Sequence, residues 1–185
     1  ELMIATKIID PASTFKVALN KLCIGDSISA RGVDGDFILP KNQQEKLVFI
    51  AGGIGITPFR AMVKYLIDKG EKRDVVLLYA NKTIADVAFT DLFKKAEKIG
   101  LITNYFFSLN RFQHTYEVVQ SVSGFIDEIA VKKHVLDWQK RTFYVSGPEP
   151  MVEAFEKMLK TMGIKGSQLK TDFFPGYSDT YQSGV

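Results

Sequence analysis

The sequence predicts an α/β protein in which most of the chain forms a doubly wound parallel sheet of five strands. Three observations support this. Strand-like and helix-like segments alternate from residue 47 onward. The first two strand-like segments, Leu47–Ala51 and Val75–Ala80, are continuously apolar, which is typical of strands covered on both faces. A glycine-rich turn joins the first of them to an amphipathic segment, as expected for a right-handed strand–helix–strand crossover.

Residues 1–40 have a different character and precede that sheet. We predict strands at Leu2–Ile9 and Ser27–Arg31, and a turn at Gly32–Gly35 that is followed by the segment Phe37–Pro40. Between the first two strands, Ser13 or Thr14 is placed to cap a short amphipathic helix. The polar residues 41–46 have no apolar periodicity, so we predict a linker there and a domain boundary between residues 1–40 and 47–177.

The larger domain is followed by a polar tail, residues 178–185. Each element of the domain is predicted from apolar patterning and from residues that begin or end helices. The predicted strands are Leu47–Ala51, Val75–Ala80, Ile102–Ser108, Phe143–Ser146 and Leu169–Phe173, and the predicted helices are Pro58–Lys69, Ala85–Lys98, Ile126–Val135 and Pro150–Met162.

Composition excludes several classes of protein. The 185 residues are 46% hydrophobic and carry a net charge of +3 with both signs mixed, so no nucleic-acid partner is predicted. Cys23 is the only cysteine, which excludes an internal disulfide framework, and neither cysteine nor histidine spacing predicts a metal site. No apolar run is long enough to span a bilayer and no signal peptide opens the chain. We therefore expect a soluble, cytoplasmic protein.

The segment Gly52–Pro58, which reads Gly-Gly-Ile-Gly-Ile-Thr-Pro, is the strongest local motif. Glycines let a backbone approach a pyrophosphate closely, and the N–H groups that begin a helix attract phosphates. Thr57 is predicted as the helix N-cap and Pro58 as its first residue. Pro58 replaces the third glycine of the dinucleotide fingerprint, and Asn81 follows the second strand where an acidic residue is expected. An ordinary NAD-dependent dehydrogenase is therefore disfavoured.

The segments that contain these departures resemble those of another family, the ferredoxin–NADP⁺ reductases and related flavoreductases. Gly52–Pro58 is similar to that family's Gly-Gly-x-Gly-x-Thr-Pro loop. Tyr144–Pro148, followed by Met151, resembles its Ser-Gly-Pro or Cys-Gly-Pro signature, and Tyr79–Lys82 resembles its second strand. The segment Thr171–Tyr177 resembles its terminal acidic and aromatic segment, and Ser13-Thr14-Phe15 its flavin-diphosphate turn.

The resemblance implies that residues 1–40 are the closing part of an antiparallel flavin barrel. The family holds the flavin ring with Arg-x-(Tyr/Phe)-(Ser/Thr), and this sequence contains no such motif. We therefore expect the chain to begin partway through the barrel, with the ring-binding motif upstream, and FAD to be absent from the chain alone. An upstream segment or a second copy of the chain is expected to cover the incomplete barrel.

The resemblance also implies a reaction and a set of site residues. NAD(P)H passes hydride to FAD, which supplies electrons to an iron–sulfur or haem protein or domain. Ser146, Asp172 and Phe173 would lie at the nicotinamide, where the family has its catalytic residues, with Phe174 as the alternative to Phe173. The residues implied to bind cofactor are Gly52, Gly53, Gly55, Thr57 and Pro58 at the pyrophosphate, Asn81 and Lys82 at the adenosine ribose, Gly147, Pro148 and Met151 in the second signature, and Ser13 and Thr14 at the flavin diphosphate.

Several alternatives remain open at this point. Ser146 would serve only as a helix cap in a purely structural interpretation. A nucleotide-binding module without catalysis of its own is the main alternative function. A methyltransferase ranks last because it does not account for Ser146-Gly147-Pro148. The choice between NAD and NADP, the electron acceptor, and any upstream redox or membrane domain also remain open.

Overall fold

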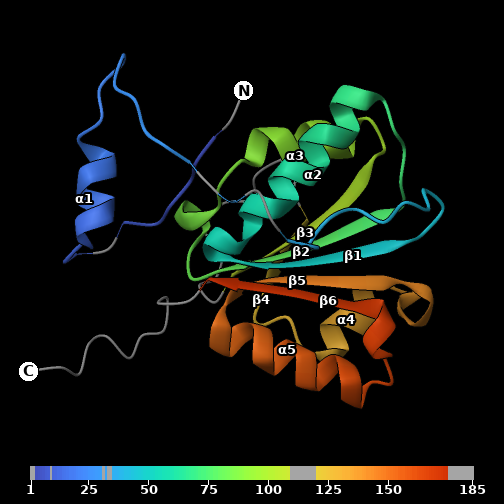
Figure 1. The fold of residues 1–185 in the computed structure, drawn as a ribbon. Coiled ribbons are helices and arrows are strands. Elements are labelled where there is room, and N and C mark those ends of the chain that lie inside the picture. The colour runs from blue at the N-terminus through green and yellow to red at the C-terminus, as the bar shows by residue number, and fades with distance from the viewer. Residues whose placement is uncertain (1–2, 9, 31, 33–34, 109–119, 175–185) are drawn as a thin grey trace, which may run out of the picture. The chain divides into compact units, whose positions relative to one another are not determined.

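The computed structural model describes residues 3–8, 10–30, 32, 35–108 and 120–174, and it divides the chain into two units, residues 1–36 and 37–185 (Figure 1). The first unit contains helix α1 (Thr14–Asn20), which begins after Ser13 as predicted. The Ser13 hydroxyl accepts the Lys16 N–H at 3.4 Å. The described residues of α1 include no buried side chain.

The strands predicted at Leu2–Ile9 and Ser27–Arg31 are not formed in the part of the first unit that the structure describes. A strand is stabilised by pairing with a neighbour, and the described residues there offer no paired neighbour. The flavin barrel itself therefore stays a prediction.

The second unit is built on a parallel sheet of six strands in the order β4-β3-β2-β1-β5-β6. All five pairings are parallel, with Ala51 of β1 opposite Tyr79 of β2 and Ser146 of β5. The strands are β1 (Leu47–Gly52), β2 (Val75–Asn81), β3 (Ile102–Ser108), β4 (Gln120–Ser123), β5 (Thr142–Pro148) and β6 (Leu169–Phe174).

The doubly wound parallel α/β fold is confirmed, with one strand more than the five predicted. The additional strand is β4, which pairs with the end of β3 from Tyr105 to Ser108. Its sequence, Gln-Ser-Val-Ser, has one apolar residue, so neither length nor patterning predicted it.

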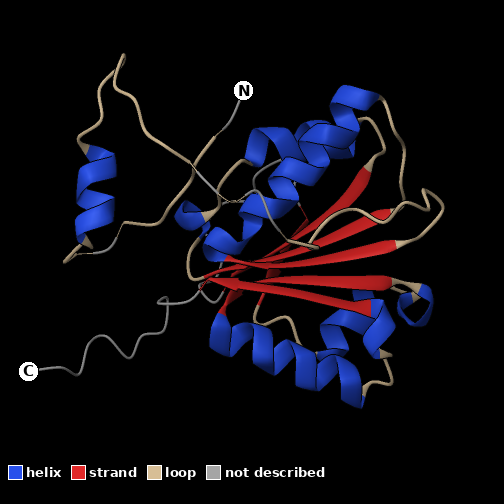
Figure 2. Ribbon diagram, in the orientation of Figure 1, coloured by secondary structure: helices blue, strands red, loops and turns tan. Residues whose placement is uncertain are grey.

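Helices cover both faces of this sheet, as Figure 2 shows. Side chains of α2 and α3 pack in one apolar cluster with Phe49 and Leu77, and side chains of α4 and α5 pack in another with Val48 and Ile50. Successive residues of β1 thus enter opposite clusters, which explains why the strand is continuously apolar. The helices are α2 (Ile56–Lys69), α3 (Thr90–Lys98), α4 (Glu128–His134) and α5 (Glu149–Thr161).

Helix α3 begins five residues later than the predicted start at Ala85. The Asp86 carboxylate accepts hydrogen bonds from the Thr83 N–H at 3.1 Å and the Thr83 hydroxyl at 2.8 Å, which forms a local turn. Phe89 then has a left-handed backbone with φ of 59°, so the helix cannot continue backwards through it. The helix therefore begins at Thr90.

Residues 37–46 belong to the second unit, and several contacts join them to its helices and strands. The Phe37 ring packs beside Phe59 and Tyr144, with centroid distances of 5.7 and 5.2 Å. The Tyr144 hydroxyl donates to the Ile38 carbonyl at 2.8 Å. Arg73 donates to the Pro40 carbonyl at 2.8 Å. Phe37–Pro40, predicted as part of the barrel domain, forms no strand, and these contacts hold it against the side chains of α2 and β5.

Charged side chains gather at the amino ends of the strands. Arg141, 6% exposed, pairs with Asp137 and with Asp74 and also donates to the Leu47 carbonyl at 3.3 Å. The Arg141 guanidinium lowers the pKa of Asp137 to about 2. These groups lie at the opposite end of the strands from the glycine turn. Within residues 3–8, 10–30, 32, 35–108 and 120–174, no helix has both the length and the apolar character needed to cross a bilayer.

Candidate functional site

The carboxyl ends of the strands bring most of the predicted site residues to one edge of the sheet. The glycine turn follows β1, Asn81 ends β2, and Ser146 and Asp172 lie near the ends of β5 and β6. The direction of strand order reverses between β1 and β5, because β2, β3 and β4 lie on one side of β1 and β5 and β6 on the other. Ligands of open α/β sheets bind at such a switch point. The candidate site is therefore centred on the turn after β1.

The glycine turn has one residue that faces open space. Gly53 has φ of +52°, a conformation that favours glycine, and a Cβ placed on it would meet no atom of the described residues within 4 Å. Gly53–Gly55 form a short 3₁₀ turn, η1, which runs directly into α2. An anion therefore has room to approach the backbone at Gly53.

The predicted start of α2 needs correction. Thr57 is not the N-cap and Pro58 is not the first helical residue, because the helix begins at Ile56 and its N-cap residue is Gly55. The 3₁₀ turn leads into the helix without a side-chain cap. Pro58 is accommodated in the first turn, where backbone N–H groups have no intrahelical partner. Both residues still lie at the helix end that faces the candidate site.

Gly55 is required for a close approach of two backbones. A Cβ on Gly55 would lie 2.2 Å from the Ser146 carbonyl oxygen and 2.6 Å from the Gly147 Cα. These atoms belong to β5, so a side chain at residue 55 would push the turn off the strand. The structure thus gives Gly55 a packing role in addition to its proposed place at the pyrophosphate.

A second close contact joins the turn to α5. A Cβ on Gly52 would lie 2.1 Å from the Met151 sulfur, and one on Gly147 would lie 3.1 Å from the same atom. Pro148 ends β5 and is the N-cap residue of α5. The two signatures that the sequence analysis singled out are therefore packed directly against each other.

Ser146 and Asp172 are brought together by strand pairing. They are register partners in β5 and β6, so their side chains share one face of the sheet. Ser146 is fully buried, and its hydroxyl has no hydrogen-bond partner in the described structure. Burial raises the pKa of Asp172 above its ordinary value. Phe173 points to the opposite face and is 44% exposed, so the alternation favours Phe174 over Phe173 beside these groups.

Asn81 and Lys82 occupy the other side of the turn. Asn81 is 7% exposed, and neither its amide nitrogen nor its amide oxygen has a hydrogen-bond partner in the described residues. The amide lies near the Tyr79 hydroxyl, whose pKa burial raises, but no hydrogen bond of good geometry joins the two groups. Lys82 is exposed, and its carbonyl accepts the Ser108 hydroxyl at 3.3 Å.

The residues present fit a dinucleotide. A buried amide and a buried hydroxyl, both without partners among the described residues, flank a turn with open space at Gly53, and buried polar groups are normally satisfied by protein or ligand. Ser13 and Thr14, proposed for the flavin diphosphate, begin α1 in the first unit, and Ser13 already caps that helix. Their cofactor role stays a proposal.

Sequence reasoning gave no role to Tyr79. Its hydroxyl donates to the Gly53 carbonyl at 3.1 Å, although the two residues are 26 positions apart. The signal that was available is period-two alternation in β2, which places Tyr79 on the same face as Asn81. A tyrosine in an otherwise apolar buried strand needs a partner for its hydroxyl.

Comparison with known proteins agrees with this geometry. Residues 49–157 match the family model described as "Oxidoreductase NAD-binding domain". The chain is 27% identical over 155 residues to a flavohemoprotein of Oceanobacillus iheyensis, covering 82% of this chain and 36% of that protein. It is 31% identical over 145 residues to NADH-cytochrome b5 reductase 1 of Meyerozyma guilliermondii, covering 76% and 49%. The chain thus spans less than half the length of either relative.

Solved structures with the same fold include two reductases. The cytochrome b5 reductase domain of Ulva prolifera nitrate reductase has a TM-score of 0.72 at 22% identity, over 87% of this chain and 64% of that one. The cytochrome P450 reductase GcoB of Amycolatopsis has a TM-score of 0.72 at 21% identity, over 91% of this chain and 50% of that one. At these identities the likeness shows the fold.

Proposed function

The chain belongs to the oxidoreductase NAD-binding domain family of ferredoxin reductase-like flavoenzymes, and we propose that it holds NADH or NADPH with the nicotinamide at Ser146. The observation that carries this proposal is that Asn81 and Ser146, on the two strands that flank β1, are buried polar side chains with no partner among the residues that the structure describes. Between them lies the glycine turn. A dinucleotide lying across this edge would give partners to both.

Each group has a distinct proposed task. The backbone at Gly53 and the start of α2 bind the pyrophosphate, because free N–H groups and the helix dipole favour an anion. Asn81 and Lys82 bind the adenosine ribose. Ser146 donates to the nicotinamide carboxamide and orients the ring, and Asp172 is its neighbour on the same face. Ser146 is fully buried, so contact with the ring requires the groups that cover it to move aside.

The proposed activity is electron transfer through a flavin. The nicotinamide supplies a hydride when bound, and FAD accepts it. FAD would be held by the flavin barrel, to which residues 1–40 with Ser13 and Thr14 contribute. The acceptor would be an iron–sulfur or haem protein or domain, consistent with relatives named flavohemoprotein and NADH-cytochrome b5 reductase. We further propose a cytoplasmic location and cover of the incomplete barrel by an upstream segment or a second copy.

Calorimetry on the chain tests the nucleotide site. We expect NADH to bind the wild type more tightly than ADP-ribose, which lacks nicotinamide. Ser146→Ala should weaken NADH about five- to tenfold, since a hydrogen bond contributes about 1 kcal/mol, and should leave ADP-ribose unchanged. The same variant should unfold at an equal or higher temperature, because the hydroxyl it removes is buried with no partner in the described part of the chain. A wild type that binds neither nucleotide would contradict the proposed function.

Lys82 tests the choice of nucleotide. If it pairs with a 2′-phosphate, Lys82→Ala should weaken NADPH by about three- to tenfold and NADH by less than about twofold, with the difference shrinking in high salt. Lys157→Ala is the control, because Lys157 is an exposed lysine toward the distal end of α5. Equal losses for NADPH and NADH would rule out the 2′-phosphate role.

A nucleotide-binding module without catalysis of its own is the second candidate function. Full burial of Ser146 favours it, because a hydroxyl that stays covered cannot meet the nicotinamide. It predicts that NADH and ADP-ribose bind equally well to the wild type and that Ser146→Ala changes neither affinity. The titration above therefore distinguishes the two functions.

A further inference from the structure

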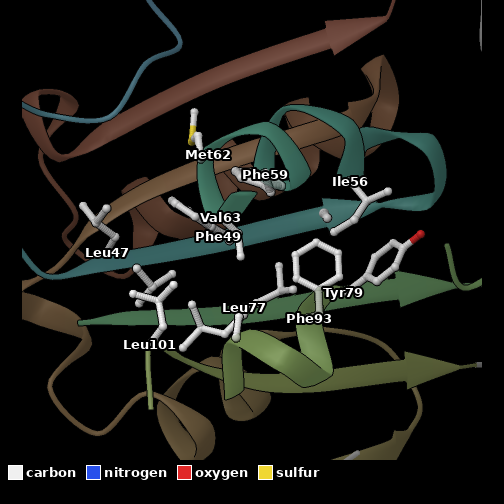
Figure 3. Packing of buried hydrophobic residues seen from close by; sticks show 14 of the residues in the cluster. Leu47, Phe49, Ile56, Phe59, Met62, Val63, Leu77, Tyr79, Phe93 and Leu101 are labelled. Atoms are coloured by element: carbon white, nitrogen blue, oxygen red, sulfur yellow. The ribbon is translucent and has the colours of Figure 1, made fainter. Parts of the chain in front are cut away.

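Tyr79 places a hydroxyl directly beneath the glycine turn. It is fully buried in β2, and its ring packs beside Phe106 with a centroid distance of 5.9 Å. Figure 3 shows Tyr79 at the end of the apolar cluster near Ile56, with its oxygen directed out of the cluster. Burial raises the pKa of Tyr79, so the hydroxyl keeps its proton and acts as a donor.

This hydroxyl joins two segments that are separate in sequence. It donates to the Gly53 carbonyl at 3.1 Å and accepts the Ala88 N–H at 3.4 Å. Gly53 belongs to the turn after β1, and Ala88 belongs to the segment between β2 and α3 that follows Lys82. One side chain therefore connects the segment proposed for the pyrophosphate with the segment that follows the residues proposed for the ribose.

The bond to Gly53 also fixes the direction of a peptide group. The Gly53 carbonyl accepts both the Tyr79 hydroxyl and the Ile56 N–H. The Gly53–Ile54 peptide is trans, and a trans peptide directs its carbonyl and its N–H to opposite sides. Holding the carbonyl toward the buried tyrosine thus turns the Ile54 N–H away from the apolar cluster. The left-handed Gly53 backbone makes this orientation accessible.

We propose that Tyr79 is a positioning residue for dinucleotide binding, because its hydroxyl holds the Gly53–Ile54 peptide with the N–H presented to the pyrophosphate. This inference rests on the proposed function. Preorganised backbone donors bind an anion without first losing conformational freedom. Without the hydroxyl, the peptide keeps the Ile56 bond but loses the contact that fixes it to β2.

Tyr79→Phe and Tyr144→Phe form a matched pair for the test. Both tyrosines are fully buried, and both donate to a backbone carbonyl, Tyr144 to Ile38 at 2.8 Å. Each variant keeps its ring and loses one hydrogen bond to a backbone carbonyl, and Tyr79→Phe also loses the 3.4 Å bond from the Ala88 N–H. We therefore expect a larger fall in melting temperature for Tyr79→Phe than for Tyr144→Phe. Only Tyr79→Phe should weaken NADH and ADP, by about tenfold, whereas Tyr144→Phe should stay within about twofold of wild type.

Other ligands separate positioning from general loosening. Adenosine lacks the phosphates, so its affinity should not change in Tyr79→Phe. A second measurement uses the wild type alone: ADP should shift the backbone amide resonance of Ile54, and adenosine should not. The inference would be overturned by an unchanged NADH affinity in Tyr79→Phe or by an equal loss of NADH affinity in Tyr144→Phe. It would also be overturned if ADP did not shift the Ile54 amide resonance. A wild type that binds no NADH would instead contradict the proposed function and this inference with it.

Discussion

Gly55→Ala is expected to reduce NADH affinity by more than about a hundredfold, which corresponds to about 2.7 kcal/mol. The new Cβ would lie 2.2 Å from the carbonyl oxygen and 2.4 Å from the carbonyl carbon of Ser146. Both are backbone atoms of a central strand, which cannot turn aside as a flexible side chain would. The turn and β5 must therefore separate, which displaces Gly53 and Ser146 together. Calorimetry with NADH measures the loss.

Overpacking should also lower the free energy of unfolding of Gly55→Ala by about 3 kcal/mol. Gly166→Ala is the control, because its Cβ meets nothing within 4 Å and its backbone does not need glycine. Gly53→Ala isolates backbone strain, since its site is open but its φ is +52°, and should cost about 1 kcal/mol. If Gly55→Ala bound NADH with an affinity within about threefold of that of the wild type, the prediction would be wrong, because the two backbones would then separate without disturbing the site.

The central strands and the order of elements could be predicted because their signal is local. Leu47–Gly52 and Val75–Asn81 are apolar at every position but the last one or two, and both are buried along their length. The glycine turn was predictable for the same reason. The sequence does not show which atoms lie so close to each glycine that a side chain would clash with them. At Gly55 these atoms belong to the backbone of β5, whose residues lie about 90 positions further on.

The misassigned elements depend on neighbours or on local side-chain bonds. β4 has the sequence Gln-Ser-Val-Ser and is a strand because it pairs with β3. The Leu2–Ile9 segment has strand-forming residues, but its described part is not paired with a strand and forms none. Ala85–Ala88 has helix-forming residues, but the Thr83–Asp86 turn and the left-handed Phe89 delay α3. Pattern alone carries none of this information.

The site divides in the same way. Ser146 and Asp172 were predicted together from the resemblance, and strand register places them side by side. Phe173 was predicted with them, but alternation along β6 places it on the other face. The hydroxyl of Tyr79 was not predicted at all, because its partner Gly53 is near only in the folded chain. Contacts between the ends of different strands are the part that sequence leaves open.

The first unit decides whether this chain holds a flavin. Its described residues contain one helix and no strand, and many of its apolar side chains are exposed, including Ile4 at 59%, Phe15 at 67% and Ile28 at 54%. Apolar groups left in water contribute nothing to a core, and a binding site needs a rigid scaffold around it. The sequence also lacks the ring-binding Arg-x-(Tyr/Phe)-(Ser/Thr) motif. Both observations motivate the prediction that this chain by itself does not hold the isoalloxazine.

The chain alone is therefore expected to purify colourless and to reduce dye acceptors with NADH or NADPH no faster than free FAD does. Added FAD should not change this, because the nucleotide site without a neighbouring flavin has no hydride acceptor. Visible absorption, quenching of flavin fluorescence on titration, and the rate of dye reduction measure these properties. NADH binding by the same preparation is the control that the second unit is folded. A version extended to include the ring-binding motif should be yellow and active, whereas a yellow, active 185-residue chain would show that the flavin site is complete without it.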